Sequence, residues 1–189
     1  IAFNTSTSSD EWYCSAYLND NDWTLSASNQ CVKGRLVGGS GPITAARRFG
    51  DDVLVYKSGS MFKGVYVGSP EVWRFTQVST DVGAVGQEAV VDTHLGHIFV
   101  GRDNIYSFDG TTPIPLATGV TRDWLYRDMS VSYRDRAKVM WDRARLRLWI
   151  YYCSAGSTGT VDRCIVYHVG TKKWGLAHAT VEAVVHYQT

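Results

Sequence analysis

Short apolar strands separated by tight turns recur along the chain in groups of four, and this repeat constrains the fold more than any other feature. The plainest group starts at Ile43 and has turns at Phe49-Gly-Asp-Asp52 and Lys57-Ser-Gly-Ser60. Equivalent first strands start at Ile43, Ala89 and Ala137. This spacing of about 40 to 50 residues is typical of β-propeller blades. The sequence therefore predicts successive four-stranded units.

The residue pattern inside these units supports strands over helices. Residues alternate between apolar and polar in Arg145-Leu-Arg-Leu-Trp-Ile150, whereas Val53-Leu-Val-Tyr56 is continuously apolar, as strands buried on both faces are. Pro113 to Leu116 is expected to close the second unit as a short strand. Only Gly119 to Met129 has apolar residues near helical spacing, with Thr121 as its N-cap.

The expected fold class is all-β, part of a β-propeller with about three four-stranded blades plus the edges of neighbouring blades. Residues 1–40 are interpreted as the end of a preceding blade and a linker, and 41–84 as a blade. Residues 85–130 are interpreted as a blade with a short inter-blade helix, and 131–189 as a blade and the start of the next, supplied by a strand over 181–187. Because the chain opens at Ile1 without an initiator Met, we expect a fragment of a longer polypeptide.

The charge pattern argues against a polyanion as the obvious partner. The chain has 19 Lys and Arg against 18 Asp and Glu, a formal net charge of +1, and the two signs are interspersed. The most basic stretch, Arg134 to Arg147, is broken by Asp135 and Asp142 and is interpreted as a solvated turn. No apolar run approaches the roughly 20 residues of a membrane helix, and no signal peptide opens the chain, so a soluble protein is expected.

The four cysteines, Cys14, Cys31, Cys153 and Cys164, do not form a recognisable framework. Cys153 and Cys164 flank the loop Ser154 to Asp162 and could face each other across a hairpin, but two buried free thiols are the favoured interpretation. A CxxC motif is absent from the sequence, so zinc binding has no support.

Two short motifs resemble ligand sites but are better explained as turns. His94 and His97 would need a third ligand such as Asp92 to hold a metal, yet they bracket a turn containing Gly96. Gly38-Gly-Ser-Gly41 lacks the final glycine of a dinucleotide fingerprint and the Lys-Ser/Thr pair of a P-loop, so it is interpreted as an inter-blade linker.

Neither carboxylates nor aromatic residues define a catalytic site. The carboxylates that a propeller glycosidase would need are each found beside Gly or Asn in an expected turn, where Asp bonds its own backbone: Asp51, Asp52, Asp81, Asp103 and Asp109. Trp and Tyr could stack on sugars if exposed, but those within strands are expected in the core: Trp73, Trp141, Trp149 and Trp174. We therefore predict no catalytic, cofactor-binding or metal-binding residue, no cofactor and no enzyme.

A set of segments in a fixed order resembles β-propeller proteins of bacteriophage tails, of the nozzle or tail-hub type. The segments cover most of residues 12 to 175: Asp20-Asn-Asp-Trp23, Gly41-Pro-Ile-Thr-Ala45, Gly50 to Tyr56, Ser79 to Ala84, Phe99 to Gly110, Arg122-Asp-Trp124 and Arg163 to Trp174. Cys14, Cys31 and the loop Ser154 to Asp162 fall outside the family pattern.

The resemblance implies a structural virion protein, assembled in the bacterial cytoplasm and located in the tail beneath the portal. It implies a homo-oligomeric ring, often of six copies, that contacts portal-side adaptor proteins and fibres and lets viral DNA pass without specific binding or membrane contact. The alternative is a receptor-binding or glycan-processing propeller of a phage tail. An exposed Trp/Tyr cluster in a groove, or a carboxylate pair at catalytic spacing, would favour that alternative.

Overall fold

The computed structural model describes residues 1–183, which form mainly antiparallel strands. The chain divides into two compact units, Ile1–Gly83 and Ala84–Thr189. Each unit contains two sheets, and the resulting four antiparallel sheets of three or four strands confirm the all-β class. Among the described residues, no helix is both long and apolar enough to cross a membrane.

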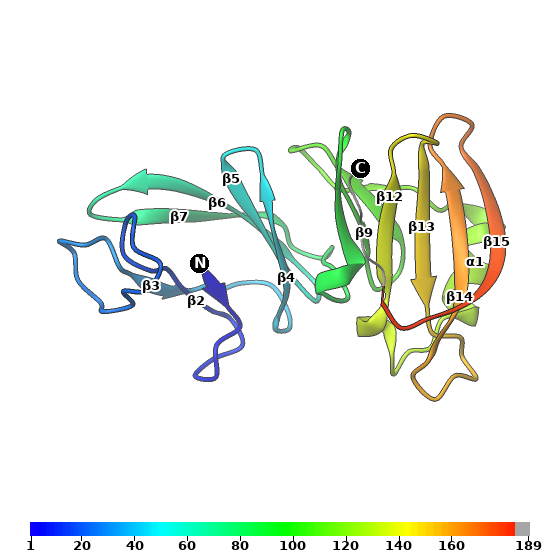
Figure 1. Ribbon diagram of the computed structural model, residues 1–189, viewed down its shortest axis with the longest axis horizontal. Helices are drawn as coiled ribbons and strands as arrows, with labels where there is room; N and C mark the ends of the chain where they lie inside the picture. Colours follow the sequence, from blue (N-terminus) through cyan, green and yellow to red (C-terminus); the bar gives the residue numbers. More distant parts are fainter. Residues whose placement is uncertain (184–189) are drawn as a thin grey trace. The chain divides into compact units, whose positions relative to one another are not determined.

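The first unit combines a small sheet with a larger one (Figure 1). The small sheet consists of β1 (Ala2–Phe3), β2 (Glu11–Tyr13) and β3 (Lys33–Arg35). The larger sheet consists of β4 (Ile43–Phe49), β5 (Asp52–Lys57), β6 (Met61–Gly68) and β7 (Val72–Ser79). Its strands pair in sequence order, so the four strands predicted from Ile43 onward form one meander.

Apolar side chains from both sheets form the core of the first unit. Trp12 of β2 lies against Phe75 of β7, with ring centroids 4.9 Å apart. Gly34 pairs directly with Trp12 across β2 and β3, and a Cβ at Gly34 would come within 2.8 Å of the indole ring. A side chain at Gly34 would therefore displace Trp12 from the core.

The second unit contains two four-stranded sheets, each again in sequence order (Figure 1). One holds β8 (Val90–Thr93), β9 (Gly96–Val100), β10 (Ile105–Phe108) and β11 (Ile114–Pro115). The other holds β12 (Lys138–Asp142), β13 (Arg147–Tyr152), β14 (Val161–His168) and β15 (Lys173–Val181). Short 3-10 turns, Gln87–Ala89 and Arg134–Arg136, precede β8 and β12.

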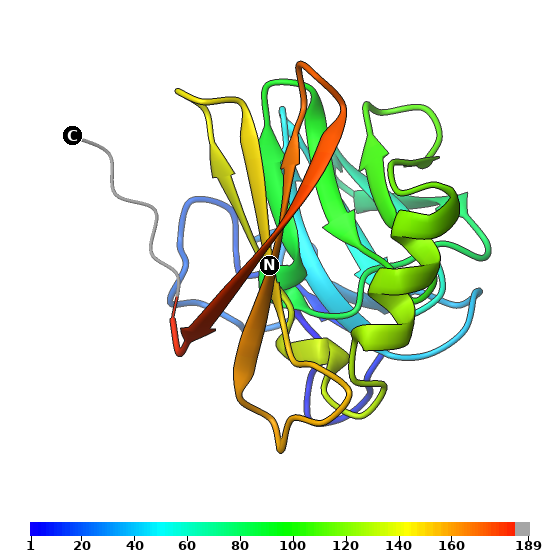
Figure 2. The ribbon, with the colours of Figure 1, turned by 90° about the vertical axis from the view of Figure 1, so that its right-hand side faces the viewer.

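The predicted helix is present as α1 (Gly119–Asp128) and lies against both sheets of the second unit (Figure 2). Its Leu125 is fully buried in the shared core, and the Tyr126 hydroxyl donates to the Gly101 carbonyl beyond β9 at 2.9 Å. The expected N-cap was wrong. Thr118 precedes the first helical residue, whereas Thr121 lies inside the helix, because the helix starts two residues before it.

The sequence misplaced two strand boundaries. The strand expected at Pro113 to Leu116 is only Ile114–Pro115, an edge strand in which proline costs no ladder hydrogen bond. The strand expected over 181–187 as the start of another blade was also wrong at its beginning. Val181 is the last residue of β15, and 182–183 are not in a strand. Residues 184–187 lie outside the described residues.

Candidate functional site

The two histidines singled out by sequence have different environments. His97 of β9 is fully buried, whereas His94 in the β8–β9 turn lies beside Trp141, with ring centroids 5.5 Å apart. Within residues 1–183, no group of three or more His, Cys, Asp or Glu side chains could hold a metal ion. The structure therefore accounts for this pair through a turn and a core position.

The five aspartates considered for glycoside hydrolysis are each bound by local partners. Asp52 pairs with Lys63 at 2.8 Å, and Asp51 with Arg48 at 3.6 Å. Asp103 accepts the Tyr106 hydroxyl at 2.9 Å. Asp109 accepts from the Thr111 side chain and backbone, which lowers the pKa of the Asp109 carboxyl, and Asp81 accepts from Ser79. These bonds match the turn chemistry expected of Asp.

A buried tyrosine in the second unit has an acid–base partner but little access to a substrate. The Tyr152 hydroxyl donates to Asp128 at 2.8 Å, and Arg163 Nε lies 3.6 Å from the same carboxylate. Tyr152 is fully buried, and burial together with the Asp128 bond raises its pKa. A tyrosine nucleophile needs an accessible and more acidic hydroxyl, so this cluster fits a structural role better.

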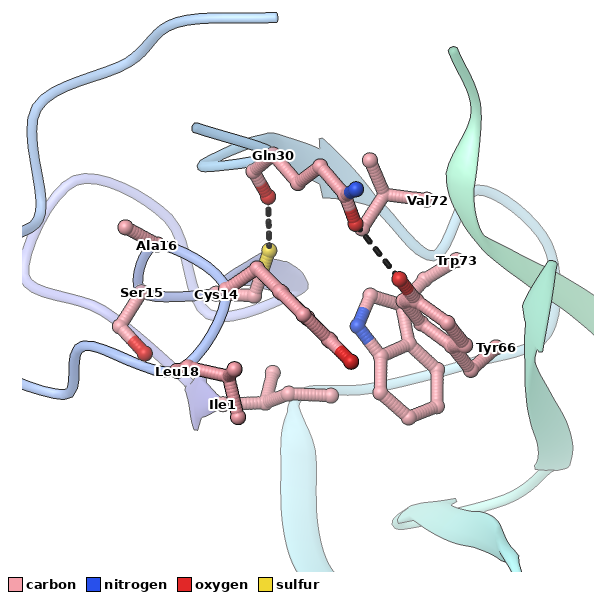
Figure 3. A pocket seen from close by; sticks show the side chains of 10 residues that line it. Ile1, Cys14, Ser15, Ala16, Leu18, Gln30, Tyr66, Val72 and Trp73 are labelled. Atoms are coloured by element: carbon pink, nitrogen blue, oxygen red, sulfur yellow. Dashed lines mark hydrogen bonds between the residues drawn. The ribbon is translucent and has the colours of Figure 1, made fainter. Parts of the chain in front are cut away.

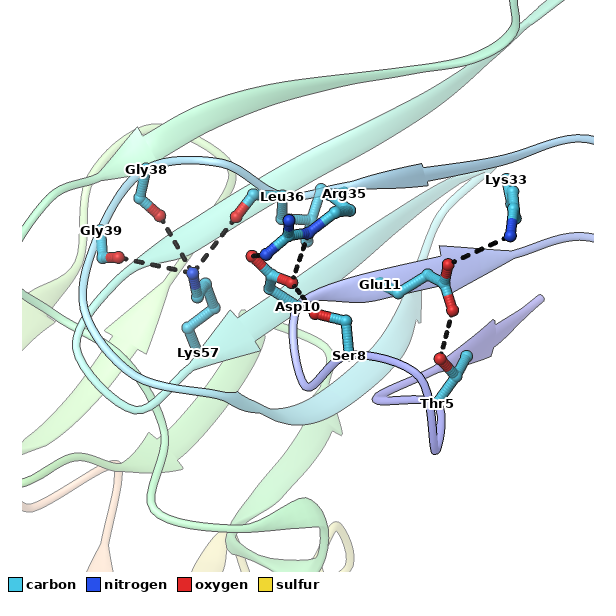
Figure 4. Close-up of polar contacts among 10 residues, drawn as sticks. All are labelled: Thr5, Ser8, Asp10, Glu11, Lys33, Arg35, Leu36, Gly38, Gly39 and Lys57. Atoms are coloured by element: carbon cyan, nitrogen blue, oxygen red, sulfur yellow. Dashed lines mark hydrogen bonds and ion pairs between the residues drawn. The ribbon is translucent and has the colours of Figure 1, made fainter.

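The Gly38 to Gly41 loop surrounds a buried ammonium group (Figure 4). Lys57 Nζ donates to the carbonyls of Leu36 at 3.2 Å, Gly38 at 3.2 Å and Gly39 at 3.4 Å. A phosphate site would present N–H groups, whereas this loop turns carbonyls toward a cation. The loop therefore belongs to the scaffold. Sequence reasoning missed Lys57, whose only signal is a lysine directly after an apolar strand.

All four cysteines are buried free thiols, which confirms the prediction made for Cys153 and Cys164. In the β13–β14 ladder, Cys164 pairs with Tyr151, so Cys153 does not face it. Burial raises the pKa of the Cys164 thiol to about 11. Such a thiol is mostly protonated at neutral pH and is a poor nucleophile.

The most open arrangement of aromatic side chains lines a cavity of about 300 Å³ in the first unit (Figure 3). Tyr17 and Tyr66 are near parallel, with an interplanar angle of 14° and centroids 6.3 Å apart. Trp73 meets Tyr66 edge-on with centroids 5.6 Å apart. The full lining is Ile1, Cys14, Ser15, Ala16, Tyr17, Leu18, Gln30, Tyr66, Val72 and Trp73. We call this cavity the aromatic pocket.

The rim of the aromatic pocket is unusually exposed for apolar residues. Tyr17 is 59% exposed, Tyr66 42% and Leu18 90%. The Tyr66 hydroxyl donates to Gln30 Oε1 at 2.6 Å, which joins β6 to the loop before β3. Burying such side chains would be favourable, so an exposed aromatic cluster in a concave site indicates a binding surface.

The expectation of four core tryptophans was only partly right. Trp141 is buried, but Trp73, Trp149 and Trp174 are half-buried. Trp73 forms a wall of the aromatic pocket, and Trp174 lines a shallower apolar groove with Trp124 and Leu176. Alternation along a strand identifies the side on which a residue lies, but not whether that side is covered.

Comparison with known proteins does not assign the chain to a family. No protein-family model matches it, and no curated protein matches it. The geometry alone therefore describes what the site can do. The aromatic pocket offers ring faces, a side-chain amide and a hydroxyl, and these groups suit binding of an uncharged ligand rather than acid–base chemistry.

Proposed function

We propose that this chain is a stretch of β-propeller that serves as a structural component of a bacteriophage tail. The observation that carries the proposal is the succession of three four-stranded antiparallel meanders, β4–β7, β8–β11 and β12–β15. A four-stranded meander is the unit from which propeller blades are built. The tail assignment rests on the ordered segments between residues 12 and 175 that resemble nozzle and tail-hub proteins.

A structural role also agrees with the state of the polar side chains. The aspartates near turns are occupied by local partners, and the buried Tyr152 is bonded to Asp128. In the tail, the expected partners are further copies of the chain in a ring of about six, portal-side adaptor proteins and fibres. Viral DNA would pass the ring without specific binding.

The test is the location of the chain in the virion. In a cryo-EM reconstruction of particles containing the full-length protein, we expect this chain in an axial ring beneath the portal. A single copy at a fibre tip, or absence from the particle, would contradict the nozzle role.

A second candidate function is recognition of a cell-surface glycan by a phage tail. The specific observation in its favour is the exposed Tyr17, Tyr66 and Trp73 cluster around a cavity. Recognition is favoured over glycan processing because no carboxylate lines the aromatic pocket, whose ten lining residues are all described. This candidate is compatible with a place in the tail.

A further inference from the structure

We propose that the aromatic pocket binds a neutral pyranose ring of a polysaccharide, an inference that rests on the second candidate function. The faces of Tyr17 and Tyr66 are the stacking surfaces, with Trp73 as the adjoining wall. The C–H groups of a pyranose carry partial positive charge and pack on the negative face of an aromatic ring. A cavity of about 300 Å³ is large enough for a small ligand.

The charge of the lining identifies the ligand class. None of the ten residues that line the aromatic pocket is Asp, Glu, Lys, Arg or His. An acidic sugar would need a cation beside it, and a basic ligand would need a carboxylate. A neutral ligand with many hydroxyl groups has no such requirement, so the pocket matches an uncharged hexose better than a sialic or uronic acid.

Gln30 supplies the polar contact. Its Oε1 accepts the Tyr66 hydroxyl at 2.6 Å, which orients the side-chain amide (Figure 3). Within the described part of the chain, no protein hydrogen bond engages Gln30 Nε2, so its two N–H groups are available to a ligand hydroxyl. A donor next to an aromatic face is the combination that orients a sugar ring and sets its specificity.

Backbone strain is concentrated around the same pocket. Six non-glycine residues among those described have positive φ, and three of them line the pocket: Leu18 at 58°, Gln30 at 61° and Val72 at 67°. Left-handed conformations are costly for such side chains, most of all for a β-branched valine. Strained residues cluster at binding sites because the surrounding structure holds a side chain in place for its ligand.

The experiment is saturation-transfer-difference NMR on the 189-residue chain with maltotriose, lactose and mannotriose as neutral probes. Sialic acid and glucuronic acid are the charged comparisons. We expect transfer to at least one neutral probe and none to the charged sugars. Binding of the charged sugars alone would overturn the neutral pocket but preserve glycan recognition. Absence of transfer to every probe would overturn both.

Variants locate the site. Tyr17→Ala should weaken binding about tenfold by removing an exposed ring. Gln30→Asn keeps an amide on a residue type that tolerates positive φ, yet it shortens the reach, so it should also weaken binding. The matched control is Trp124→Ala, which removes a 38%-exposed aromatic side chain from the groove in the second unit. Loss of binding with Trp124→Ala and not with Tyr17→Ala would overturn the assignment to this pocket while leaving glycan recognition intact.

Discussion

Lys57 has a charged group in the interior of the first unit, where three carbonyls take the place of water. The residue is 4% exposed, and its aliphatic stem continues the apolar run of β5. Hydrogen bonds to Leu36, Gly38 and Gly39 offset the cost of removing the ammonium group from water. Lys57 thereby fixes a glycine-rich loop that has few other constraints.

Replacing Lys57 by methionine tests this role. Lys57→Met keeps most of the volume but leaves three carbonyls without their donor, so the free energy of unfolding should fall by about 2 to 4 kcal/mol. Urea denaturation followed by circular dichroism measures the change. The control is Lys63→Met, which removes a partly exposed ion pair with Asp52 and should cost less than about 1 kcal/mol. Equal effects of the two variants would contradict the buried-cation role.

Asp10 makes the acid stability of the first unit depend on a surface ion pair (Figure 4). Hydrogen bonds from Arg35, at 2.9 and 3.0 Å, and from Ser8 hold the pKa of the Asp10 carboxyl at about 2, below its ordinary 3.8. The folded-state pKa is therefore lower than the unfolded one. The contribution to stability is present above the ordinary pKa and is lost as the pH falls toward 2.

Asp10→Asn should remove that pH dependence. We expect its melting temperature to fall less steeply than that of the parent protein as the pH is lowered from the ordinary Asp pKa to about 2. Thermal melts at closely spaced pH values measure the difference. Arg35→Gln removes the cation of the same pair and should flatten the same interval. Parallel profiles for parent and Asp10→Asn would show that the pair does not contribute.

At the scale of the elements, the hairpin β8–β9 depends on a glycine that no other residue can replace without strain. Gly96 has a φ of 100°, and a Cβ there would collide with the Phe108 carbonyl of β10. Phe108 pairs with His97, the residue after Gly96, so the collision cannot be relieved without shifting the β9–β10 ladder.

Gly96→Ala should lower the free energy of unfolding by about 1 to 3 kcal/mol, since it combines a left-handed backbone with a backbone clash. Chemical denaturation gives the value. Gly156→Ala is the matched control, because no atom lies within 4 Å of the added Cβ and Gly156 is not in the left-handed region. Its effect should stay within about 0.5 kcal/mol. A neutral Gly96→Ala would mean that this turn is adaptable.

At the scale of the whole molecule, balanced charge predicts weak contact with DNA. The net charge is +1 and the two signs are interspersed, so few counterions would be released on binding a duplex. Fluorescence anisotropy with a labelled duplex at physiological ionic strength should show no saturable binding. Tight binding with a steep dependence on salt would contradict a channel lining that lets DNA pass.

Local patterns in the sequence were sufficient for the all-β class and for most hairpins. Alternating residues, turn glycines and turn aspartates act over a few positions, so the strands β4 to β7 and the helix α1 could be predicted. Boundaries were less certain where capping residues repeat, as Thr118 and Thr121 do. The free cysteines followed from the absence of a disulfide pattern.

Only the tertiary structure decided which side chains share a site. Tyr17 and Gln30 come from loops, whereas Tyr66 and Trp73 come from neighbouring strands, and no local pattern links them. Similarly, the partners of Lys57 are backbone carbonyls, which every residue possesses and which therefore leave no trace in the sequence. The sequence by itself determined the strands and turns, because these depend on nearby residues. The aromatic pocket and the buried cation depended on packing between segments far apart in the chain, so only the folded structure decided them.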